Sequence, residues 1–172
     1  MRLSLALVLL VAAALGADAA PPAKAPKKPE TRNIAQLVTV SGECTRLVQA
    51  GVTVEGCKPV LMNLNYSTGV SAYWFMTERT ILSFSGDGAR RVEQGPDTVV
   101  QAIEKVIVAA ASSAFNADDT KEETAIGVCR FGNPTIKGAM LKCVAHTQAG
   151  RYEGTFVPNG TPPQLEAFQV DP

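Results

Sequence analysis

Short apolar runs separated by glycine, asparagine and aspartate recur along most of the chain, and each run has the length of a β-strand. Turn-forming residues stand between the runs, as at Ala50-Gly51, Gly86-Asp87-Gly88 and Ala149-Gly150. The runs are QLVTVSG, CTRLVQ, VTVEG, VLMNLNY, VSAYWFMT, TILSFSG, AIGVCRF, GAMLKCVAHT and RYEGTFV. Strands at such even spacing predict an all-β fold, either an antiparallel sandwich or a small barrel of about eight strands.

One segment, PDTVVQAIEKVIVAAASSAF, fits two structures. Asp97 stands where a helix N-cap would, and apolar residues after it recur on one helical face, which would give a short helix near 98–111. The run VIV at 106–108 is β-branched throughout, which favours a strand over about 101–108 instead. The strand is preferred and the helix stays open. The following NADDTKEET is expected to be a charged loop.

The two ends of the chain differ in composition from its middle. Residues 1–19 combine a basic start, an apolar run and a small-residue pattern before Ala19, which predicts a secretory signal peptide cleaved near Ala19. The apolar run is shorter than the roughly 20 residues of a membrane span. Residues 20–33 resemble a flexible leader rich in proline and lysine, residues 34–158 a single β domain, and residues 159–172 a loosely structured, proline-rich tail.

The four cysteines are expected to form two hairpin disulfides. With Ala50-Gly51 as a two-residue turn, outward pairing places Cys44 opposite Cys57 in a non-hydrogen-bonded pair, close enough for a disulfide. Pairing Cys129 with Cys143 is simplest for the second stretch. A symmetric hairpin there sets Arg130 against Lys142, so a bulge or a wider loop is favoured.

Other roles for the cysteines fit the sequence less well. Structural zinc sites use closely spaced cysteine pairs, and redox sites use C-x-x-C, and the chain has neither. An even number of cysteines in an exported chain favours disulfides, and each would stabilise the fold by about 3 kcal/mol. Four cysteines allow three connectivities, so the other two stay open. No metal or cofactor is expected.

The charge balance argues against nucleic acid as a partner. The chain has 16 basic and 16 acidic side chains, whereas nucleic-acid binding needs a basic footprint. Residues typical of catalysis are also sparse. His146 is the only histidine, and no G-x-S-x-G motif is present. Nothing in the spacing of the remaining candidates suggests a pair of catalytic carboxylates; these candidates are Glu43, Glu78, Glu93 and Glu104. The acidic residues at 118, 119, 122 and 123 lack a calcium-loop pattern.

Aromatic residues give the clearest functional hint. In the strand that contains AYWF, Tyr73 and Phe75 lie on one face and Trp74 on the other. If one face stays open, it presents an aromatic binding patch, which Tyr66 and Tyr152 could extend. Coverage of both faces is the structural alternative.

The segments SGECTRLV, CKPVLMNLNYSTG and TILSFSG, with GVCRFGNP and LKC later, resemble a set of small exported alphaproteobacterial proteins with no assigned function. The resemblance covers about residues 38–157, implies a periplasmic or secreted location and brings no active site. We therefore expect an exported, non-enzymatic β domain that binds an envelope or extracellular protein, a glycan or a small ligand. The alternatives are a secreted enzyme inhibitor or, less favoured, a secreted hydrolase using His146 or carboxylates.

Overall fold

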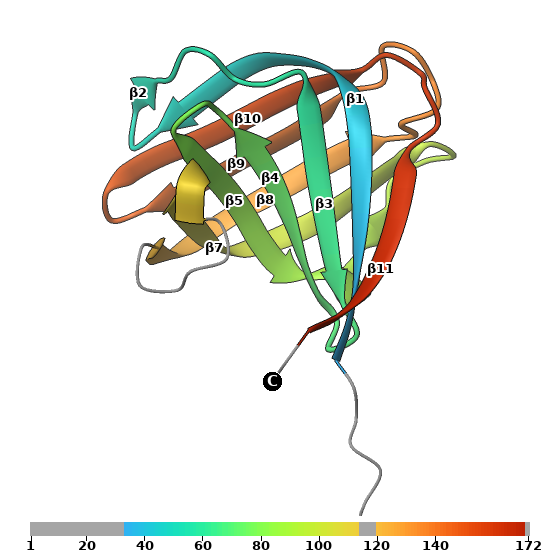
Figure 1. Cartoon of the computed structure of the whole chain (residues 1–172), viewed down its shortest axis with the longest axis horizontal. Helices are drawn as coiled ribbons and strands as arrows, with labels where there is room; N and C mark the ends of the chain where they lie inside the picture. Colours follow the sequence, from blue (N-terminus) through green and yellow to red (C-terminus); the bar gives the residue numbers. More distant parts are fainter. Residues whose placement is uncertain (1–32, 114–119, 171–172) are drawn as a thin grey trace, which may run out of the picture. The chain divides into compact units, whose positions relative to one another are not determined.

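Eight antiparallel strands close into a barrel in the computed structural model, which describes residues 33–113 and 120–170 (Figure 1). Neighbours around the ring follow the order β1, β3, β4, β5, β7, β8, β9 and β10, and β10 pairs back onto β1. The strands are β1 Asn33–Gln49, β3 Val60–Tyr66, β4 Val70–Met76, β5 Thr80–Asp87, β7 Thr98–Ala110, β8 Thr120–Gly132, β9 Leu141–Thr147 and β10 Gly150–Pro158. The predicted all-β fold of about eight strands is confirmed, and of the sandwich and the barrel that the sequence left open, the structure is the barrel.

The remaining elements are short or lie outside the ring. Strand β2 Val52–Thr53 pairs with β1, β6 Val92–Glu93 pairs with β7, and β11 Gln164–Val170 pairs with β1. Single 3₁₀ turns occupy Gly88–Arg90 and Ala111–Ser113. Because β7 runs unbroken over Thr98–Ala110, the helical alternative for 98–111 is wrong. Its β-branched residues pack into the sheet, and pairing with β5 and β8 satisfies its backbone.

Strand β1 closes the barrel by changing partners along its length. Its first half pairs with β3 and β11, and its second half, from Gly42 to Val48, pairs with β10. At Gly42 a Cβ atom would lie 2.2 Å from the Val157 carbonyl oxygen, so only glycine permits this approach. The runs QLVTVSG and CTRLVQ, predicted as separate strands, are therefore parts of one continuous strand.

The barrel interior is filled by side chains that alternate along the strands. Phe75, Phe84 and Phe156 are at most 1% exposed and pack among aliphatic residues such as Leu61 and Leu82. Phe75 meets Phe84 edge to face, with ring centroids 5.7 Å apart. This period-two pattern leaves the alternate residues of each strand on the outer face of the barrel.

The first disulfide joins Cys44 to Cys57, as predicted, with Cα atoms 5.7 Å apart. The predicted turn is also present, since Ala50 and Gly51 both have positive φ and Gln49 pairs with Val52. The ladder between β1 and β2 ends at the pair Val48–Thr53, however, because β2 has only two residues. The bond therefore links β1 to a loop, and the expected hairpin reaching out to the cysteines is wrong.

The second disulfide joins Cys129 to Cys143, which face each other across β8 and β9. Here the register is the symmetric one that the sequence disfavoured, with Arg130 opposite Lys142. The repulsion is relieved because each cation has another partner: Arg130 donates to the Gln94 side chain, and Lys142 forms an ion pair with Glu153 at 3.2 Å. The connection between these strands is a wide loop, as expected.

Two segments differ from their predicted loops. The end of NADDTKEET belongs to β8, which begins at Thr120 and pairs with β7. The tail contains β11, which pairs with residues 33–39 of β1 through its backbone, while Leu165 and Phe168 stay exposed. The predicted signal peptide, the predicted leader up to residue 32 and the acidic residues at 118 and 119 lie outside the described residues. Within the described ranges, no helix has the length and hydropathy that crossing a membrane requires.

Candidate ligand-binding site

The aromatic residues predicted to form one patch are divided between the two faces of the sheet. Tyr73 and Phe75 point into the barrel, and Tyr152 joins them in the core, so all three are buried. Their place in the predicted surface patch is wrong, because strand alternation turns them toward the apolar interior. Trp74 and Tyr66 lie on the outer face, where both line a groove.

This groove follows β5 on the outside of the barrel and has a volume of about 830 Å³. Its floor consists of small residues, chiefly Ser83 and Ser85. Trp74 is the cross-strand neighbour of Ser83 on β4, and Ile107 is its neighbour on β7, so these two large side chains flank the floor. The outer surface of a barrel is normally convex. It is hollowed here because the small Ser83 lies between the large side chains of Trp74 and Ile107.

The Ser83 hydroxyl is the distinctive group in this groove. Ser83 is only 5% exposed, and its oxygen has no hydrogen-bond partner among the described residues. A buried hydroxyl left unpaired costs about 1–3 kcal/mol, and buried polar groups without partners are rare in folded proteins. Because Ser83 lines the groove while its oxygen is shielded from solvent, a rotation of the side chain about χ1 would bring the hydroxyl to a bound molecule that supplies the missing hydrogen bond.

The charged residues of the groove are paired with one another. Arg90 contacts Asp87 at 2.7 Å and Glu104 at 2.9 Å, and Lys105 contacts Glu122 at 2.6 Å. Hydrogen bonds from the Ala89 amide and from Arg90 hold the pKa of Asp87 below its usual value, so this carboxylate stays ionised at neutral pH. The groove thus offers hydrogen-bonding groups at its rim without an unpaired charge.

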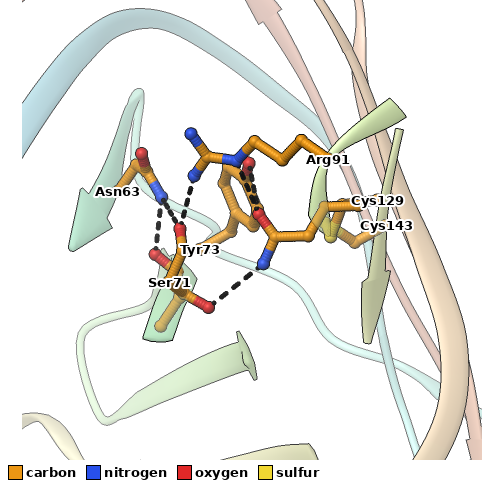
Figure 2. Close-up of a disulfide and its surroundings, with 8 residues drawn as sticks. Asn63, Ser71, Tyr73, Arg91, Cys129 and Cys143 are labelled. Atoms are coloured by element: carbon orange, nitrogen blue, oxygen red, sulfur yellow. Dashed lines mark hydrogen bonds between the residues drawn. A yellow bond between two sulfur atoms is a disulfide. The ribbon is translucent and has the colours of Figure 1, made fainter. Parts of the chain in front are cut away.

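A separate polar network lies beside the Cys129–Cys143 bond (Figure 2). Arg91 is its centre: Nη2 donates to Ser71 Oγ at 2.7 Å and to Asn65 Oδ1 at 2.8 Å, and Nε donates to Gln101 Oε1 at 3.0 Å. The guanidinium also lies 5.6 Å from the centroid of the Phe131 ring, a cation–π distance.

Tyr73 connects this network to the core. Its hydroxyl donates to Gln101 Oε1 at 3.2 Å, and Gln101 in turn donates to the Ser71 carbonyl at 3.3 Å. Burial raises the pKa of Tyr73, and this outweighs the opposing charge of Arg91, so the hydroxyl remains a donor. Arg91, Tyr73 and Gln101 therefore have hydrogen-bond partners within the network, which also includes Ser71 and Asn65, so the network is better described as structural than as a ligand site.

The residues considered for hydrolysis do not form a catalytic arrangement. His146 is exposed, and its side chain has no hydrogen bond or ion pair with another described residue, although it lines a second hollow of about 880 Å³ where β8 begins and β9 ends. Of the four glutamates considered, Glu104 alone lines the groove, and Glu78 pairs with Lys58 at 3.3 Å. No cluster able to hold a metal ion occurs within residues 33–113 and 120–170.

Ser83 and Ser85 were not among the residues that the sequence predicted for a site. A signal was present in TILSFSG, where serines alternate with the apolar Leu82 and Phe84. That alternation marks an outward face of small polar residues in a strand. It does not reveal that neighbouring strands place Trp74 and Ile107 on both sides.

Comparisons with known proteins add no template for this site. No protein-family model matches the chain, and searches of curated proteins and of solved structures give no significant match. The description of the groove therefore rests on its geometry and on the chemistry of its residues.

Proposed function

We propose that this chain is an exported, non-enzymatic binding protein that holds a small ligand in the groove along β5. The observation that carries the proposal is the buried, unpaired Ser83 hydroxyl on the floor of a groove of about 830 Å³, a volume typical of small-molecule sites. Trp74 and Tyr66 add aromatic surface at the same place. A rigid barrel with two disulfides suits a site whose floor is built from strands.

An oxidising compartment is part of the proposal. Disulfides persist in the periplasm and outside cells, and the first 19 residues have the pattern of a secretory signal. The aromatic and serine-lined groove favours binding, whereas the isolated His146 gives a hydrolase little support. We therefore prefer a periplasmic or secreted binding role over the inhibitor and hydrolase alternatives.

The test is recovery of a ligand from the native source. The purified protein is incubated with the low-molecular-mass fraction of an envelope or culture extract, isolated again and denatured, and the released molecules are identified by mass spectrometry. Ser83→Phe and, separately, Ser85→Phe fill the groove. Val128→Phe is the matched control, because Val128 is an exposed outer residue of β8 outside the groove.

We expect the native protein and the Val128→Phe variant to release the same molecule unchanged, and both groove-filled variants to release none. Equal recovery from folded groove-filled variants would place the ligand elsewhere. Recovery of a chemically altered molecule, with turnover over time, would favour the hydrolase.

A further inference from the structure

We infer that the ligand of the β5 groove is a neutral saccharide. This inference rests on the proposed binding function and adds the chemical class of the ligand. Three properties of the groove restrict that class: the pairing of its charges, the unpaired hydroxyl on its floor and the pairing of its backbone.

The charges of the groove argue for an uncharged ligand. Each of the five charged residues that line it has an opposite charge within 4 Å: Arg90 with Asp87 and Glu104, and Lys105 with Glu122. An anionic or cationic ligand would have to break one of these pairs or enter without a counter-charge. A neutral molecule meets neither cost, and it can still accept from Arg90 or donate to the carboxylates.

The floor of the groove argues against a purely apolar ligand. An acyl chain over Ser83 would leave its hydroxyl without a partner, so the cost of about 1–3 kcal/mol that the ligand-free protein already carries would remain. A ligand hydroxyl could donate to this oxygen or accept from it. Ser85 provides a second hydroxyl beside the first on the same face of β5.

The backbone under the groove argues against a peptide. Extended peptides bind sheets mainly through an open edge, where main-chain groups are available. Strand β5 is paired with β4 on one side and β7 on the other, so its backbone offers no open edge. Recognition in this groove must therefore come from side chains.

A neutral saccharide satisfies all three conditions. Its hydroxyls both donate and accept, which suits Ser83 and the rim carboxylates Asp87 and Glu104. The flat C–H face of a pyranose is apolar and can be buried against an aromatic ring, a contact that Trp74 or Tyr66 can make in this groove.

Trp74 also provides the assay, because it is the sole tryptophan in the chain. A change in tryptophan emission on titration therefore reports on the groove. The probes are three neutral trisaccharides, namely maltotriose, cellotriose and tri-N-acetylchitotriose. The comparison ligands are N-acetyl-trialanine amide as a neutral peptide and methyl laurate as a neutral acyl chain without a hydroxyl. Calorimetry with the same ligands gives affinities that do not depend on the fluorophore.

At least one trisaccharide is expected to change the emission saturably, and Ser83→Ala should weaken its binding about fivefold, the factor of one net hydrogen bond. Ile126→Ala, a variant of an exposed outer residue away from the groove, should bind like the native protein. Trp74→Phe should abolish the emission change while calorimetry still detects the ligand.

The inference is overturned if none of the three trisaccharides binds up to about 10 mM, beyond the millimolar limit of weak binding. It is also overturned if the folded Ser83→Ala variant binds them as tightly as the native protein. Binding of the peptide alone or of methyl laurate alone would contradict the saccharide class. In each case recovery of another small molecule from the extract would leave the proposed binding function intact, whereas failure of that experiment would remove both.

Discussion

At the scale of single residues, one buried side-chain oxygen within the described ranges, that of Ser83, has no hydrogen-bond partner, whereas the buried serine at position 71 has several. Ser71 lies in the network around Arg91, where its hydroxyl donates to Asn65 Oδ1 at 2.9 Å and accepts from Arg91 at 2.7 Å. Ser83 of β5, which stands between the apolar Leu82 and Phe84, has no such partner. Two buried serines therefore have opposite consequences for stability, and this difference can be measured.

Replacing Ser83 by alanine should raise the free energy of unfolding of the ligand-free protein by about 1 kcal/mol, because it removes a buried hydroxyl that has no partner. Urea denaturation gives the measurement. Ser71→Ala is the control and should lower the same quantity, since it leaves Arg91 and Asn63 short of a partner. A Ser83→Ala protein less stable than the native one would contradict the prediction.

Gly154 of β10 packs directly against the core residue Phe75, so a larger residue at this position has no room. A Cβ atom at Gly154 would lie 2.5 Å from Phe75 Cζ, well inside van der Waals contact. Gly154→Ala should therefore lower the free energy of unfolding by about 2 kcal/mol through overpacking. At Gly132 the nearest atom to such a Cβ is 3.3 Å away, so Gly132→Ala is the matched control and should change stability less. Equal losses in the two variants, measured in urea, would argue against the close contact.

At the scale of elements, the two disulfides connect different kinds of structure. Cys129 and Cys143 are wholly buried and face each other across paired strands, whereas Cys44–Cys57 attaches a loop to β1. The loops that they close are nearly equal, with sequence separations of 14 and 13. The chain-entropy contribution of each bond is therefore similar, and a difference between them must come from packing.

Removing Cys129–Cys143 should cost more than removing Cys44–Cys57. In the chain-entropy model each double alanine variant loses about 3 kcal/mol. The buried pair should lose more, because its sulfur atoms leave a cavity in the core. The measurement is the urea midpoint of the Cys129→Ala/Cys143→Ala and Cys44→Ala/Cys57→Ala proteins. A larger loss for the Cys44 pair would show that loop attachment matters more than core packing.

The sequence predicted most elements because local signals and tertiary contacts agree in them. The run VLMNLNY is strand β3 as expected, and the turn at Ala50-Gly51 has the predicted position. The predictions failed where the structure of a segment depends on a partner that is distant in the sequence. Nothing local shows that Gln164–Val170 pairs with β1, or that Glu153 relieves the repulsion of Lys142. The groove was missed for the same reason, because Trp74, Ser83 and Ile107 become neighbours only when the strands pair.

At the scale of the whole molecule, the barrel closes where its first and last ring strands meet. Glu153 of β10 is buried on the outer side of this seam, with its side chain 4% exposed. Three cations surround it: Arg46 of β1 at 3.2 Å and Arg151 of β10 at 2.7 Å come from the two strands of the seam, and Lys142 at 3.2 Å comes from the neighbouring β9. A single carboxylate thus connects three strands across the closure.

This closure should weaken in acid. Burial alone raises the pKa of Glu153, but hydrogen bonds from Lys142 and Arg46 and the nearby positive charges outweigh it and hold the pKa below its usual value. A depressed pKa in the folded state means that the stabilisation is present above the unfolded pKa, about 4.3, and is lost as the pH falls through the folded pKa.

Glu153→Gln should lower the free energy of unfolding at pH 7 by about 2 kcal/mol, the scale of hydrogen bonds to a charged group. The difference from the native protein should shrink as the pH is lowered below about 4, because protonation then removes the same charge. Urea denaturation between neutral and acid pH gives both curves. The background loss from Asp87 and Glu123, whose pKa values are also lowered, is common to both proteins. Curves that stay parallel throughout would exclude Glu153 as the source.

The pairing of β1 with β11 has one more consequence, since Asn33 and Val170 are cross-strand partners. Both ends of the described strands leave the molecule side by side, as Figure 1 shows, so a short peptide could join them. New termini could then be opened at the β4–β5 connection near Glu78, which is exposed. A circularly permuted chain of this kind would keep every strand pairing of the ring while changing the order in which the strands leave the ribosome.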